Sequence, residues 1–431
     1  MSARARPQRG FSLVELMIAL GVGVIIIAGA VGLMISTQHH FQSTSGERAL
    51  QEAARVALGH VTNNLRNTGY GVDPALAFDL GPLTNVRIDQ AYSGQTFSTS
   101  STPAAGGGCT GLCRDSTTGP DEIVFYARDP AFGPHPLAVA ASSSSAGLVV
   151  AGPVNVPLQR GQVLQVACYS GGMTWAYVTV SGAATDNGDG TVTIPIAGSG
   201  TTFPKQNAWL DDPCFSSVAT VTSKVLNTAT LVSAAEVFKV DRYRYFVATY
   251  DDGGNVQPWG TAGARPYLML DQGLKDSAGN AIQSVVAPDV EDLQLAYVFP
   301  GDAATPLVGA TSGAAISNSD TGINLAPGVR NPDYADAPDA PTRATHHPGN
   351  IGAVRVYVVV RSPVADPNLP NSATLPAAGN RDVTAGPPGY SRLLVDTTVA
   401  VPNLATSCPY FPGYGGSTAT SGNRQLNVGG G

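Results

Sequence analysis

The sequence predicts an α+β fold in which a long N-terminal helix packs on an antiparallel β-sheet head with large loop insertions. Three observations predict it. An uninterrupted apolar run extends from Leu16 to Ile35, helical periodicity continues to residue 68, and short β-branched or aromatic segments recur in the rest of the chain. Clusters of Gly, Ser, Asn and Asp separate these segments, which is typical of strands joined by hairpins.

The composition fits an exported, loop-rich β protein. Only 13% of the 431 residues are charged, against about 25% in average globular proteins. The formal net charge is −7, and it becomes −10 if the three arginines of the first ten residues are removed. Because an acidic chain with scattered lysines has no basic stripe, we expect no direct nucleic-acid binding.

The first element is the apolar run, which follows a short basic leader. About 20 uncharged residues, at 1.5 Å of rise per residue, form a helix long enough to cross the hydrocarbon of a bilayer. Glu15 lies just inside this segment. A lone carboxylate in lipid costs about 2.5 kcal/mol or more, so such a residue usually has a partner or a function. The leader should stay cytoplasmic while the rest of the chain is exported.

The residues around Glu15 resemble the class 3 signal sequence, the processing site of type IV pilins and of the pseudopilins of type II secretion. Gly10, Phe11, Ser12, Leu13 and Glu15 all match that pattern in place. The resemblance implies that a prepilin peptidase cuts between Gly10 and Phe11 and methylates the new amino terminus. It also implies that Glu15 acts in assembly, its charge pairing with the amino terminus of a neighbouring subunit.

Two other interpretations of the N-terminus stay open. An ordinary secretory signal could be cleaved near Ala28-Gly29-Ala30, although the apolar run continues to Ile35 and Glu15 would then lie inside the apolar region of the signal. The run could also be a plain uncleaved membrane anchor. Both alternatives leave the bulk of the chain exported.

After the apolar run, the periodicity predicts an amphipathic second half of the same helix. Gly46 can loosen this helix and Gly69 is a natural C-terminal stop. The apolar stripe comprises Phe41, Leu50, Ala54, Leu58, Val61 and Leu65. The predicted organisation is therefore a leader (1–10), a membrane or filament-core helix (11–35), an amphipathic helix (36–69) and a head (70–431).

Residues 51–71 resemble the helix end of PilW-type minor pilins and of the related J-type pseudopilins, in which Leu-Arg-x-Ala-Gly-Tyr-x-Gly closes the helix. Thr68 replaces the usual Ala of that pattern. Arg55 and Arg66 are interpreted as ordinary helix residues, with contact to neighbouring subunits as the alternative.

Strands are predicted in two sets, and residues 290–297 and 354–362 again resemble the PilW-type core. In the second of these segments the valines at 354, 356, 358 and 360 alternate with other residues, so the valine face should be core. Insertions are expected near 71–119, 301–350 and 363–390. The predicted strands are 122–127, 162–167, 174–180 and 191–196, then 237–250, 266–271, 290–299, 353–362 and 392–401.

The five cysteines all follow the apolar run, so disulfides are expected in an oxidising compartment. Cys109 with Cys113 and Cys168 with Cys214 are candidate pairs, and Cys408 is left over. Connectivity is not readable from sequence, so other pairings stay open. The six histidines show no ligand spacing with a cysteine pair, and we expect no metal and no cofactor.

The segment Asp186-Asn187-Gly188-Asp189-Gly190 has two interpretations. Asn-Gly and Asp-Gly are strong hairpin signals. Asp186 and Asp189 are also weak calcium candidates, but a calcium loop needs an acidic residue at its twelfth position, which here is Ala197. The pairs at 211–212 and 251–252 are interpreted as solvated turn aspartates.

No motif for a nucleophile, a phosphate loop or paired catalytic carboxylates is present, so the sequence predicts a structural subunit. The resemblance implies a minor pilin that primes a type IV pilus and sits at or near its tip, after residence in the inner membrane with a periplasmic head. Implied partners are the prepilin peptidase, other minor pilins, the major pilin and a PilY-type tip adhesin. A J-type pseudopilin of a type II secretion pseudopilus, or a tip adhesin that uses the inserted loops, are the alternatives.

Overall fold

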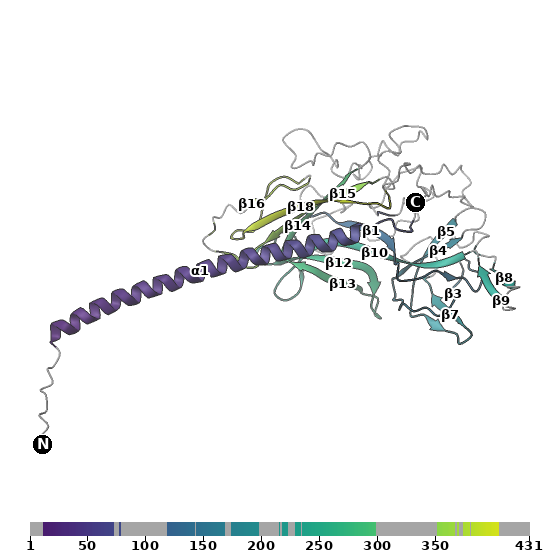
Figure 1. Ribbon diagram of the computed structural model, residues 1–431, viewed down its shortest axis with the longest axis horizontal. Helices are drawn as coiled ribbons and strands as arrows, with labels where there is room; N and C mark the ends of the chain where they lie inside the picture. Colours follow the sequence, from purple (N-terminus) through teal and green to yellow (C-terminus); the bar gives the residue numbers. More distant parts are fainter. Residues whose placement is uncertain are drawn as a thin grey trace, which may run out of the picture.

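The chain folds as one long helix followed by a β-rich head, which confirms the predicted fold class. A computed structural model describes residues 12–72, 77–78, 119–142, 144–168, 174–197, 215, 218–222, 229–233, 235–298, 351–366, 369, 374–379 and 381–404. Helix α1 (Leu13–Leu65) projects away from the head with its first half and lies along the head with its second half (Figure 1).

The head is built from short strands, most of them paired with a neighbour in sequence. The described strands are β1 (Ile123–Arg128), β2 (His135–Pro136), β3 (Gly147–Ala151), β4 (Val163–Cys168), β5 (Thr174–Thr179), β6 (Thr185–Asp186), β7 (Thr191–Pro195), β8 (Val218–Thr222), β9 (Ala229–Ser233), β10 (Ala235–Tyr250), β11 (Val256–Gln257), β12 (Arg265–Lys275), β13 (Ala281–Pro288), β14 (Val290–Val298), β15 (Ala353–Arg361), β16 (Thr374–Leu375), β17 (Thr384–Ala385) and β18 (Arg392–Ala400).

Strand β10 organises the larger sheet. This strand is 16 residues long and pairs antiparallel with β1, β2, β4, β11 and β12. Tyr245, in its second half, lies opposite Ile123 on one side and Leu270 on the other. Strand β13 adds to the outer side of β12, and β5 adds to β4, so the sheet runs in the order β13-β12-β10-β4-β5.

A second sheet has the order β14-β15-β18, and α1 packs against both sheets. The valines at 354, 356, 358 and 360 of β15 are all buried in one hydrophobic cluster with the second half of α1. That result confirms the predicted valine core face. We call this cluster the proximal core.

A distal core lies beyond the end of the helix, among β3, β4, β5 and β7, and none of its members comes from α1. Strand β10 supplies residues to both cores: Val237 belongs to the distal core, and Val240 and Tyr245 belong to the proximal one. Strands β4 and β5 also supply residues to both cores, so the two cores are joined through three strands of the larger sheet.

The predicted strands are present, with ends shifted by a few residues. Strands β3, β8, β9 and β13 were not predicted, nor were the two-residue strands β2, β6, β11, β16 and β17. Strand β3 lies in a Ser-, Ala- and Gly-rich segment. Strand β13 has no apolar alternation, because its first five residues are all exposed. Most of the expected insertions near 71–119 and 301–350 lie outside the described residues.

The expectation that 363–390 is a surface insertion needs correction. We call residues 374–379 and 381–391 the strap. It carries the short pair β16–β17, and Leu375, Ala378 and Arg381 within it are buried. The reason is that β15 has a second apolar face, since Tyr357 and Val359 pack with Ala378 of the strap. In Figure 1, β16 lies at the end of the head nearest the projecting half of α1.

Candidate functional site

The N-terminus of α1 is closed by a reciprocal capping box. Ser12 is the N-cap, and its hydroxyl accepts a hydrogen bond from the backbone N–H of Glu15 at 3.2 Å. The Glu15 carboxylate in turn accepts from the backbone N–H of Ser12 at 3.1 Å. This arrangement satisfies two of the donors that a helix start leaves free. Gly10 and Phe11, the predicted processing residues, lie outside the described residues.

The first half of α1 presents an apolar surface on which no described residue of the head packs. One candidate membrane span, Leu13–Gln38, meets the length and composition needed to cross a bilayer. Side chains around the whole helix circumference are exposed, including Leu13 at 75% and Ile25 at 73%. So large an apolar surface in water is unfavourable, and it requires lipid or other apolar helices around it.

The second half of α1 is fixed to the head by a narrow face rich in small side chains. Ala53, Ala54 and Ala57 are buried and let the helix approach the sheets closely, while Val61 and Leu65 fill the space further along. Arg55 and Arg66, singled out by sequence, are exposed and point away from this face.

A polar contact adds to this face. The hydroxyl of Tyr245 on β10 accepts a hydrogen bond from Asn64 Nδ2 at 2.6 Å and lies 2.8 Å from His60 Nδ1. Burial raises the pKa of Tyr245 well above its ordinary value, so the phenol stays neutral. Burial lowers the pKa of His60, which favours its neutral form. The helix is therefore held to the sheet through neutral polar groups.

The helix ends where the chain must turn sharply. Gly69 adopts φ +80, and its N–H donates to the carbonyl of Tyr126 on β1 at 2.9 Å. A Cβ at this position would lie 2.8 Å from Leu404 Cδ2, so Gly is required both for the backbone conformation and for space. The helix stop predicted at Gly69 is thus joined to strand β1 of the head by a backbone hydrogen bond.

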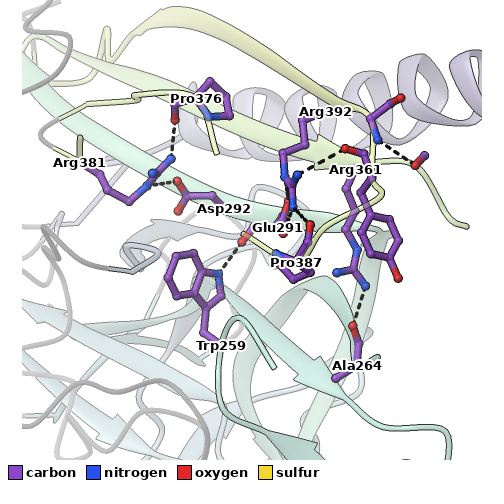
Figure 2. Close-up of polar contacts among 12 residues, drawn as sticks. Trp259, Ala264, Glu291, Asp292, Arg361, Pro376, Arg381, Pro387 and Arg392 are labelled. Carbon is purple, nitrogen blue, oxygen red and sulfur yellow. Dashed lines mark hydrogen bonds and ion pairs between the residues drawn. The ribbon is translucent and has the colours of Figure 1, made fainter. Parts of the chain in front are cut away.

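Two buried ion pairs hold the strap against β14 (Figure 2). Arg381 donates from Nε to Asp292 at 2.6 Å and from Nη2 to the carbonyl of Pro376 at 2.7 Å, and neither charged side chain has any exposed area. Arg392 donates from Nε to Glu291 at 2.6 Å and from Nη2 to the carbonyl of Pro387 at 2.8 Å. Burial raises the pKa of Asp292, and the Arg381 charge opposes that shift.

A third arginine ties β15 to the larger sheet. Arg361 donates from Nη2 to the carbonyl of Ala264 at 2.6 Å, and its guanidinium lies 4.2 Å from the centre of the Tyr390 ring. Figure 2 shows this side chain next to Arg392 and the Glu291 carboxylate. Trp259 donates from its indole N–H to the carbonyl of Glu291 at 2.7 Å. The two sheets and the strap therefore meet around adjacent acidic residues of β14.

Buried charges also occur inside the larger sheet. Arg244 of β10 donates to Glu122 at 2.6 Å and to Asp271 of β12 at 3.4 Å. Near the junction of the two cores, Lys239 lies 2.7 Å from Asp129 and 3.1 Å from Asp241. Burial raises the pKa of Asp241, whereas hydrogen bonds to Lys239 and to the backbone outweigh burial and lower the pKa of Asp129.

The calcium candidates Asp186 and Asp189 lie in a hairpin turn that uses their oxygens. Asp186 Oδ1 accepts from the N–H of Gly188 at 2.9 Å, and Asp189 Oδ1 accepts from the N–H of Thr191 at 2.9 Å. Asp251 is likewise engaged by Asn255 in a turn. Within the described part of the chain, no group of three or more His, Cys, Asp or Glu could hold a metal ion.

Cys168 is disulfide-bonded. The other four cysteines lie outside the described residues, so the pairing with Cys214 and the pairing of Cys109 with Cys113 stay predictions. Asp211 and Asp212 lie outside them as well.

Sequence reasoning found the helix and its stop, but it missed the Ser12–Glu15 capping box and the charged residues that join the parts of the head. Glu291, Asp292 and Arg361 lie within segments noted for their strand pattern, yet their role was not inferred. The signal available was the presence of charged residues inside otherwise apolar strands, since such residues are rarely buried without partners.

Two family models match the chain. Residues 5–31 match the prokaryotic N-terminal methylation motif. Residues 244–403, which include the second half of β10, strand β14, the strap with Arg381, and Arg392 of β18, match the type IV pilus-assembly protein W family. No curated protein and no solved structure matches the chain. A prepilin methylation motif on an exposed apolar helix, together with a pilus-assembly family match in the second half of the head, supports a PilW-type pilin.

Proposed function

We propose that this chain is a minor pilin that primes assembly of a type IV pilus and remains at or near its tip. The observation that carries the proposal is the exposed apolar half of α1, closed by the Ser12–Glu15 capping box and attached rigidly to a PilW-type head. Before assembly the apolar half lies in the inner membrane with the head in the periplasm. On assembly it moves into the apolar interior of the filament.

Processing starts this sequence of events. A prepilin peptidase cuts after Gly10 and methylates the amino group of Phe11, which removes the basic leader. The new amino terminus then lies one residue before the N-cap, next to the first turn of α1. There it can meet the Glu15 carboxylate of a neighbouring subunit at the same depth.

Glu15 has two separable roles in this proposal. Its carboxylate caps its own helix through Ser12, and its charge sets the register against the amino terminus of a neighbour. A Gln side chain can still accept the hydrogen bond from the Ser12 N–H, but it carries no charge. The two roles can therefore be tested with different substitutions at one position.

The experiment compares Glu15→Gln, Glu15→Ala and Ser12→Ala in the full-length chain in its host, with pili counted by electron microscopy. If the charge sets register, both Glu15 variants lose pili to the level of a deletion strain, whereas Ser12→Ala keeps them. A Glu15→Gln strain with wild-type pili would show that the carboxylate acts only as a cap.

Intact mass and N-terminal sequence supply the control for processing. The wild-type chain should begin at methylated Phe11, and it should keep its leader in a strain without the prepilin peptidase. A mature chain that begins after Ala30 would overturn the pilin pathway. Pili made at normal number without this chain, together with loss of secretion, would instead favour the pseudopilin alternative.

A further inference from the structure

Strand β13 forms an outer edge of the larger sheet and is exposed to an unusual degree. Among the described residues it pairs with β12 alone. Its first five residues are all exposed, with Ile282 at 44% and Val285 at 56%. An edge strand has one row of N–H and C=O groups directed away from its sheet, and these groups can pair with another strand.

The middle of β13, between the irregular register at its two ends, lacks the usual protection of an edge. From Ala281 to Pro288 the strand has no charged side chain. Irregular register occurs at both ends, between Leu268 and Met269 and between Asp271 and Lys275 of the partner strand β12. Between these irregularities, Gln283, Ser284 and Val285 lie in regular antiparallel register. A short, flat and uncharged stretch of edge remains open.

The outer strand of the other sheet provides a contrast within the same molecule. Strand β18 carries Asp396, which is exposed and forms an ion pair with Arg355 of β15. Charges along an edge discourage pairing with a further strand, because they would have to lose their hydration. The chain thus protects one edge with charge and leaves β13 apolar.

The position of β13 indicates where its partner comes from. Ala287 belongs to the proximal core together with the second half of α1, and Val286 packs on the same core. The exposed first part of β13 therefore lies next to the region where α1 packs on the head. Under the proposed function, pilin subunits pack side by side along their helices, so a neighbouring head lies within reach of this edge.

We propose that β13 is a docking edge to which the head of a different pilin subunit adds an extended strand with uncharged side chains. The free backbone groups require an extended partner backbone, and the uncharged edge favours apolar or neutral partner residues. A second copy of this chain fits less well, because both copies carry a net negative charge and repel each other. The partner assignment rests on the proposed function.

The experiment places the photo-crosslinking residue p-benzoylphenylalanine at position 283 of the full-length chain in its host. A matched control places it at position 398, an exposed Thr on the charged strand β18. We expect ultraviolet light to give a product with another pilin subunit from position 283 and none from position 398. Mass spectrometry of the product should locate the partner residue in a strand segment of that subunit.

Charged substitutions then test edge pairing itself. Val285→Lys and Ile282→Asp should each reduce the yield from position 283 at least tenfold, whereas Thr398→Lys should not change it. Both β13 side chains are exposed, and retention of the Cys168 disulfide and of the thermal transition checks that each variant folds. Unchanged yields in both β13 variants, equal products from 283 and 398, or a product made of two copies of this chain would overturn the proposal.

A third crosslinking site separates this proposal from the proposed function. Position 17 lies in the exposed apolar half of α1 and should crosslink to other pilins if the chain enters a filament. Products from 17 without products from 283 would overturn the docking edge and leave the pilin role standing. No product from 17 would count against the pilin role itself.

Discussion

Arg381 and Asp292 form an ion pair without any exposed side-chain area. Removing one partner of such a pair leaves an uncompensated buried charge, which usually costs about 3–5 kcal/mol. The sequence separation of 89 residues explains why the pair could not be predicted. The strand pattern around Asp292 is visible in the sequence, but no local feature shows which arginine will form an ion pair with this residue.

Arg381→Met should therefore lower the free energy of unfolding by about 3–5 kcal/mol. Chemical denaturation of the detergent-solubilised chain, followed by circular dichroism, measures the loss. Arg355→Met is the matched control, because the Arg355–Asp396 pair is partly exposed, and exposed pairs contribute about 0–1 kcal/mol. Equal losses in the two variants would contradict the burial argument.

His60 gives a pH dependence to the contact between helix and head. Burial lowers its pKa in the folded chain below the ordinary value, so the folded state binds the proton less well than the unfolded state. The stabilisation is therefore complete above the ordinary pKa of about 6.5, and it is lost as the pH falls through the lowered value.

We expect the Tm to fall as the pH is lowered from 7 to 5, and the fall to be smaller in His60→Gln. A glutamine side chain can still approach the Tyr245 hydroxyl but does not titrate. Differential scanning fluorimetry at each pH supplies the comparison. The same slope in both proteins would assign the pH dependence to groups other than His60.

At the scale of elements, helix α1 shows how much a periodic pattern can predict. The stripe of apolar residues, the stop at Gly69 and the change from an all-round apolar half to a one-sided half were all predicted from sequence. Ala53 and Ala57, which make the closest approach to the sheets, were not, because alanine carries little periodic signal. Strand β13 was not predicted for a related reason. Its first five residues are all exposed, so no alternation of apolar and polar residues marks it in the sequence.

Two small substitutions in α1 should act in opposite directions. Ala57 is completely buried against the head, so Ala57→Leu should overpack the interface and destabilise the chain by about 1–3 kcal/mol. A Cβ at Gly59 would meet nothing within 4 Å, so Gly59→Ala should stabilise the helix by about 0.5–1 kcal/mol. Denaturation midpoints of both variants measure these changes. If Ala57→Leu stabilised the chain, Ala57 would not lie in the face of α1 that packs on the head.

At the scale of the whole molecule, the head has two cores that share strand β10. The fold class and most strands were predictable, because periodicity and turn residues are local. The division into two cores was not, since it depends on which strands pair across long separations. The same holds for the strap, whose Pro- and Gly-rich sequence resembles a surface loop although buried charges fix it.

The outer strands of the distal core should open separately from the proximal core, because no described residue of α1 belongs to the distal core. In the Ala57→Leu variant, hydrogen exchange should become faster at the amides of β14 and β15 in the proximal core and stay unchanged in β3 and β7 of the distal core. Hydrogen-exchange mass spectrometry resolves these segments. Faster exchange in both cores by the same factor would mean that the head unfolds as one cooperative unit.

The contact between Gly69 and Leu404 has a consequence for the order of biosynthesis. Asn403 donates to the carbonyl of Thr68 across a separation of 335 residues, and Leu404 covers the end of α1. A ribosome makes the helix first and this cover among the last residues, and closing so long a loop is slow. The end of α1 thus stays uncovered until these residues have been made. A chain stalled before residue 404 lacks the contact of Leu404 with Gly69 after the end of α1. Incomplete subunits therefore differ from complete ones where the helix meets the head.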